Sequence, residues 1–226
     1  MSSLSLNNIS HYASWLGSLI ISIICLIDFK KRPGYVKVLG IYGLNSVIFS
    51  LLQELSSLLF QNQHINTIGH VYVLLESIIL SWLFYLVIPV RRFRQAILFS
   101  IALYTLVFLF SFLLFPKSAH AIIRSVRDLQ IIIFCLSYFF YLLRELPQDD
   151  LMQFPMFSIN TALLIFFSGT FILSYFREYI IAMMGDGFGN YLAFRNFFRF
   201  AFCLVLAYAG WLNLQSIRAQ KSGWPH

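Results

Sequence analysis

Charged residues are scarce in this chain of 226 residues. They make up 11% of the total, whereas a typical soluble domain has about 25%. Cysteine is scarce as well: Cys25, Cys135 and Cys203 fall in three separate apolar runs, a pattern that favours packing residues over disulfide bonds. These shortages exclude an ordinary soluble enzyme and a secreted disulfide scaffold. An apolar content of 59% also excludes a disordered tail.

The apolar residues lie in seven long runs of roughly 17–26 residues, the length that an α-helix needs to cross a bilayer. Four of the six prolines fall between these runs and Pro225 follows the last one, whereas Pro155 suits the first turn of a helix. The sequence therefore predicts an all-α, polytopic seven-transmembrane-helix bundle that forms one domain over residues 1–226. The region 177–190 is expected to be the longest non-helical connection, with a glycine-rich turn at 185–189. The predicted spans are 12–28, 35–60, 67–88, 95–115, 121–143, 155–176 and 191–214.

Lysine and arginine gather in alternate connections. Basic residues at 30–32 follow the first span and those at 91, 92 and 94 follow the third, whereas the second connection, about 61–66, has none. Because basic connections stay in the cytoplasm, this asymmetry predicts an N-terminus outside and a C-terminus in the cytoplasm. The first span is expected to remain as an uncleaved helix, since its basic residues follow the apolar run.

Ionisable residues inside the spans gather toward one side of the predicted membrane. Spans two and three run in opposite directions, so Glu54, near the end of one, and Glu76, in the first half of the other, both fall in the outer half. Spans five and seven open with further charged residues. We interpret the pattern as a polar cavity open to the outside and lined by spans two, three, five and seven. A set of buried ion pairs, such as Glu54 or Glu76 with Arg199, explains it equally well. The candidate ligand-binding residues are Glu54, Tyr72, Glu76, Arg124, Arg127, Asp128, Arg195, Asn196 and Arg199.

Signatures of catalysis and of cofactors are missing. No histidine pair has the helical spacing of zinc ligands, and no serine lies in a nucleophile elbow. The stretch Gly185–Gly189 lacks the residues of a phosphate loop or a calcium loop. We therefore expect no catalytic residue, no metal site, no cofactor and no nucleic-acid partner. The fourth span, from Ala96 to Phe115, has no ionisable residue and is predicted to be peripheral.

Seven helices with an external N-terminus are shared by several known classes. The last span has no lysine for a retinal Schiff base, which excludes a rhodopsin. The chain also resembles SWEET-type and PQ-loop transporters, whose two three-helix repeats flank a linker helix. Leu44–Asn45–Ser46 and Ile159–Asn160–Thr161 are similar to each other and lie where such repeats would correspond. This resemblance implies a transporter for a small solute.

A longer resemblance rests on three stretches: Val71–Glu76, Ile159–Gly169, and Arg195–Asn196 through Trp211. They are similar to a family of uncharacterised bacterial seven-helix membrane proteins whose members look like partners of sensor kinases. The resemblance implies a bacterial protein with a signalling or receptor role. Together with the polar cavity, it predicts a protein of the bacterial inner membrane that binds a small, anionic ligand from the outer side and signals to a membrane or cytoplasmic partner. Three alternatives stay open. They are a transporter, an enzyme that acts on a lipid or its headgroup through Glu54, Glu76 and a nearby histidine, and a purely structural membrane subunit.

Overall fold

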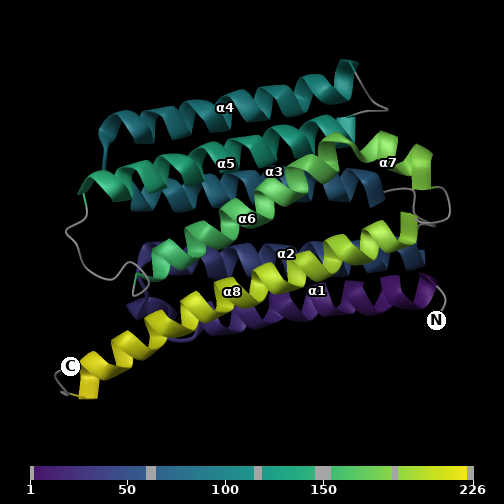
Figure 1. Ribbon diagram of the computed structural model, residues 1–226. Helices are drawn as coiled ribbons and strands as arrows, with labels where there is room; N and C mark the ends of the chain where they lie inside the picture. The colour runs from purple at the N-terminus through teal and green to yellow at the C-terminus, as the bar shows by residue number, and fades with distance from the viewer. Residues whose placement is uncertain (1–2, 60–64, 115–118, 146–153, 185–187, 223–226) are drawn as a thin grey trace.

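The computed structural model describes residues 3–59, 65–114, 119–145, 154–184 and 188–222, and these residues form helices joined by short connections (Figure 1). Within them, seven helices are long and apolar enough to cross a membrane, which confirms the prediction of an all-helical, multi-pass membrane protein. They are α1 (Ser3–Leu26), α2 (Gly34–Leu59), α3 (Ile65–Val87), α4 (Arg91–Leu114), α5 (Ala119–Glu145), α6 (Pro155–Tyr175) and α8 (Phe188–Ser222).

The long helices lie side by side, with the start of α1 and the end of α8 at opposite ends of the bundle (Figure 1). We call the end at which α1, α3, α5 and α8 begin the N-terminal end. Helix α1 packs against α2 and α8, and α5 packs against α3, α4 and α6. A Cβ atom on Gly43 would lie 2.4 Å from the Ser22 hydroxyl oxygen, so α1 and α2 cross closely there because this residue has no side chain.

Helix α4 lies at the edge of the bundle, as predicted (Figure 1). Only 11% of its spanning segment is buried, against 39–50% for the other six, and it packs mainly against α3 and α5. Its first turn corrects one expectation, because Arg91, Arg92 and Arg94 belong to the helix and not to a preceding loop. Arginine is a good helix former, and these residues follow Pro89, which separates them from α3.

The prediction of a non-helical connection over 177–190 is wrong. Helix α7 (Arg177–Met184) occupies most of it, and α8 begins already at Phe188. The segment from Arg177 to Met184 contains no glycine or proline and ends before Gly185, so its residues favour a helix. Residues 185–187 of the expected turn lie outside the described part of the chain. A short 3-10 helix, η1 (Phe29–Lys31), connects α1 to α2.

Candidate functional site

Glu76 of α3 is the centre of a buried polar cluster toward the N-terminal end. Its side chain is almost fully shielded, and its Oε1 atom accepts hydrogen bonds from Tyr42 at 3.1 Å and from Tyr72 at 2.7 Å. Its Oε2 atom pairs with the guanidinium of Arg127, from α5. An isolated carboxylate in a membrane interior costs several kcal/mol, and these three donors compensate for much of that cost.

Arg127 connects this carboxylate to a second one. Its Nε donates to Asp128 Oδ1 at 2.6 Å, and Asp128 is completely buried. The hydroxyl of Ser174, from α6, lies 3.5 Å from the other oxygen of Asp128. The guanidinium carbon of Arg127 also lies 5.0 Å from the ring centre of Phe167, within the range of a cation–π interaction. One arginine therefore joins α3, α5 and α6.

Arg199 of α8 approaches the same cluster from the opposite side. Its NH2 group donates to Ser46 Oγ at 3.0 Å and to the hydroxyl of Tyr72, whose ring lies beneath the guanidinium. Its Nε atom is buried and has no hydrogen-bond partner among the described residues. The ion pair of Glu76 with Arg199, one of the two interpretations of the sequence, does not form directly, because Tyr72 lies between the two groups and Arg127 takes the carboxylate.

A polar cavity adjoins these three residues. It consists of two neighbouring hollows of about 60 and 110 Å³, both lined by Tyr72, Arg124, Arg195, Asn196 and Arg199. The smaller one extends to Glu76 and Arg127, and the larger one extends to polar side chains of α1 and α2. A hollow that holds one water needs about 10–15 Å³, so the cavity has room for several waters or a small ligand.

The structure brings most of the predicted site residues to this cavity. Seven of the nine line it: Tyr72, Glu76, Arg124, Arg127, Arg195, Asn196 and Arg199. Asp128 lies behind Arg127 and supports it. Glu54 lies in a separate hollow between α1 and α2, where it pairs with His11 at 3.3 Å and is about half exposed.

Helices α1 and α6 also contribute, which the sequence analysis missed. His11 and Ser14 of α1 line the larger hollow, and Thr170 and Ser174 of α6 line the smaller one. Serine and threonine occur often in transmembrane helices and can bond to the preceding turn, so they give no signal comparable to a charge. The i, i+4 spacing of Ser46 and Ser50, which both line the larger hollow, was the available signal for the contribution of α2.

A second buried arginine lies at the other end of the bundle. Arg32, just after η1, donates to the carbonyl oxygens of Ile24 at 2.8 Å, Ile27 at 3.1 Å and Gly210 at 2.9 Å, and to Asn213 Oδ1 at 2.9 Å. Burial lowers the pKa of Arg32 from its ordinary value, but a guanidinium remains charged at neutral pH even so. This arginine satisfies the last carbonyls of α1 and fixes α8 to them.

Among the described residues, no group of three His, Cys, Asp or Glu side chains is placed to hold a metal ion. No protein-family model matches the chain, and neither a curated protein nor a solved structure matches it. The arrangement of charges in the polar cavity is therefore the main basis for a function.

Proposed function

We propose that the polar cavity binds a small anion and that the protein is a membrane receptor for it. The observation that carries the proposal is the concentration of Arg124, Arg127, Arg195 and Arg199 around one hollow in a bundle with few other charges. Guanidinium groups bind carboxylates and phosphates through paired, charge-assisted hydrogen bonds. Arg127 is buried and the other three arginines are partly buried. Shielding positive charge from water is costly in a membrane, and a bound anion would offset that cost.

The charges of the cluster favour an anion over a cation. Glu76 and Asp128 are both engaged by Arg127, so four positive charges face two negative ones and two positive charges are in excess. Glu54, in the neighbouring hollow between α1 and α2, would reduce the excess to one positive charge, but its side chain is half exposed and pairs with His11. We assign Arg199, Arg195 and Arg124 to the ligand. Glu76 and Asp128 then position Arg127 and the Tyr72 hydroxyl.

The orientation of the chain determines which compartment supplies the ligand. The basic connections predict that the N-terminal end, with the cavity, faces outward. Leu59 at the end of α2 and Lys31 in η1 are both exposed and lie at opposite ends of the bundle. With cysteine introduced at each, an impermeant maleimide should label Leu59→Cys in intact cells and Lys31→Cys only after permeabilisation. The reverse pattern would place the cavity on the cytoplasmic side. A signalling partner follows from the family resemblance alone.

Thermal unfolding in nanodiscs tests the binding site. Inorganic phosphate and acetate should raise the melting temperature of the wild-type protein, because a ligand that binds only the folded state stabilises it by about 2.7 kcal/mol at 100 times its Kd. Arg199→Gln should lose most of this increase. Arg91→Gln removes the same charge from an exposed position at the opposite end and should retain it.

Two results would contradict the proposal. One is the absence of any anion-dependent stabilisation of the wild-type protein at millimolar concentration. The other is an equal response of Arg199→Gln and Arg91→Gln, which would place the anion elsewhere. Uptake of the same anion into proteoliposomes would retain the site but favour the transporter alternative.

A further inference from the structure

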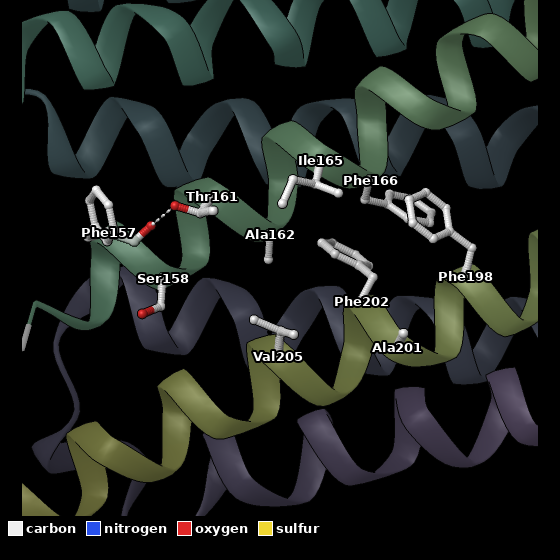
Figure 2. Close-up of a pocket in the computed structure, with 10 residues that line it drawn as sticks. All are labelled: Phe157, Ser158, Thr161, Ala162, Ile165, Phe166, Phe198, Ala201, Phe202 and Val205. Carbon is white, nitrogen blue, oxygen red and sulfur yellow. Dashed lines mark hydrogen bonds between the residues drawn. The ribbon is translucent and has the colours of Figure 1, made fainter. Parts of the chain in front are cut away.

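An apolar groove lies between α6 and α8 (Figure 2). It is next to the polar cavity, with which it shares Phe166. Its volume is about 310 Å³, and it is lined by six residues of α6 between Phe157 and Phe166 and by Phe198, Ala201, Phe202 and Val205 of α8. Its outer side is formed by Ile165 and Val205, which are 58% and 43% exposed and would face lipid in a membrane. The Thr161 hydroxyl donates to the carbonyl of Phe157 at 2.9 Å, so this group is satisfied within its own helix.

Phe166 separates the groove from the cavity, since it lines both. Its ring stacks on Phe202 with centroids 4.3 Å apart and on Phe198 with centroids 5.5 Å apart. The three rings gather at the end of the groove nearer the start of α8 (Figure 2). Gly169 makes room for them, because a Cβ atom there would lie 2.9 Å from the ring of Phe198.

Groove and cavity follow one another along the axis of the bundle. On α8, the cavity residues Arg195 and Arg199 precede the groove residue Val205. Helix α6 runs in the opposite direction, and on it the groove residue Phe157 precedes the cavity residue Ser174. On both helices, these cavity residues therefore lie nearer the N-terminal end than these groove residues. The two helices also diverge toward the N-terminal end (Figure 1). The positively charged cavity therefore lies toward the ends of the helices, and the apolar groove, which would face lipid, extends from it toward the bilayer centre.

We propose that the ligand is a single-chain anionic amphiphile of the bilayer, with a compact carboxylate or phosphate head in the cavity and its alkyl chain in the groove. This inference rests on the proposed anion site and names the class of its ligand. The groove residues of α6 from Phe157 to Phe166 span about 14 Å at 1.5 Å per residue, which gives an extended chain a continuous apolar surface. The small volume of the cavity favours a compact head over a large headgroup.

The opening toward lipid gives such a ligand a lateral path to the arginines. A head that reaches Arg199 from the groove must pass Phe166, whose ring is held by stacking on Phe198 and Phe202. Phe166 is the residue that both spaces share, so its side chain is the one that has to rotate to join them. The charge of the head selects the ligand, and the chain supplies apolar contact area that a free anion lacks.

The experiment compares three probes in nanodiscs of zwitterionic lipid: hexadecanoate, hexadecanol as the uncharged chain, and acetate as the head alone. Hexadecanoate should bind at least tenfold more tightly than either of the others. Val205→Trp, which fills the groove from its lipid side, should weaken hexadecanoate binding at least tenfold and leave acetate binding unchanged. Leu204→Trp is the matched control, because the neighbouring residue is equally exposed but does not line the groove.

Ala201→Phe provides a second block of the groove in case Val205→Trp fails to fold. Equal affinities of hexadecanoate and hexadecanol, or unchanged hexadecanoate binding in both folded groove variants, would overturn the inference. The anion site would still stand if acetate binding depended on Arg199. The proposed function would be overturned as well if acetate did not bind to the wild-type protein and Arg199→Gln had no effect on hexadecanoate binding.

Discussion

Arg32 and Arg199 both place a guanidinium among packed helices, at opposite ends of the same bundle. Arg32 has acceptors around each of its donating nitrogens, three of them backbone carbonyls, and is 3% exposed. Arg199 bonds to two hydroxyl groups, leaves its Nε without a partner among the described residues, and borders a cavity. The first arginine is enclosed by the fold, and the second faces space that the fold leaves open.

The difference separates a structural charge from a candidate binding charge. Burial and an unusual environment are common to both residues, so neither property identifies a site. Arg32 caps the last turn of α1, where Asp28 takes the left-handed conformation with φ 57° that ends many helices. Donor capacity that remains next to a hollow is what distinguishes Arg199, because only there can a ligand add bonds that the protein does not already make.

Replacement of Arg32 should have the largest effect on stability. Arg32→Met leaves the carbonyls of Ile24, Ile27 and Gly210 without their donor, and we expect a loss of about 3–5 kcal/mol, because hydrogen bonds to a charged group contribute about 1.5–3 kcal/mol each and are not additive. Thermal unfolding in nanodiscs measures the loss. Lys31→Met, at the exposed neighbour, should change little. A variant as stable as the wild type would show that Arg32 is not the cap described here.

Glu76→Gln and Glu54→Gln compare the enclosed carboxylate with the half-exposed one. Glu76→Gln weakens the bonds from Arg127, Tyr42 and Tyr72 and should cost about 2 kcal/mol. Glu54→Gln removes a half-exposed partner of His11 and should stay within about 0.5 kcal/mol of the wild type. Both variants should retain the stabilisation by acetate. Loss of this stabilisation in Glu76→Gln would mean that acetate binding depends on the position in which the Glu76 carboxylate holds Arg127 and Tyr72.

The sequence was sufficient for the seven long helices and for the common level of the charged residues that line the cavity. Long apolar runs leave few alternatives to spanning helices, and the depth of Glu76, Arg127 and Arg199 along their helices placed them at one level of the bundle. Burial of charge is expensive in a membrane, so residues at one level tend to meet. The depth of the residues predicted that they form a cluster. It did not predict which arginine pairs with Glu76, because depth does not give the direction in which each side chain points.

Other features depend on packing that no local pattern encodes. Arg32 was counted only as a basic residue of a connection, since its acceptors on Gly210 and Asn213 lie 178 and 181 residues away. The groove at Phe166 depends on the divergence of α6 from α8, and phenylalanines are so frequent in this chain that the three involved carry no signal of their own. The helical segment Arg177–Met184 was missed because the glycines after it dominated the interpretation.

The tyrosine pair around Glu76 gives the smallest and most selective comparison. Tyr42 and Tyr72 both donate to the same carboxylate oxygen, but Tyr72 also accepts from Arg199 and lines the cavity, whereas Tyr42 is enclosed. Tyr42→Phe and Tyr72→Phe should each lower stability by about 1 kcal/mol, the net contribution of one hydrogen bond. Only Tyr72→Phe should alter acetate binding, because it releases the Arg199 guanidinium from its position over the ring hydroxyl. Equal effects of the two variants on acetate binding would show that the cavity arginines do not depend on Tyr72 for their placement.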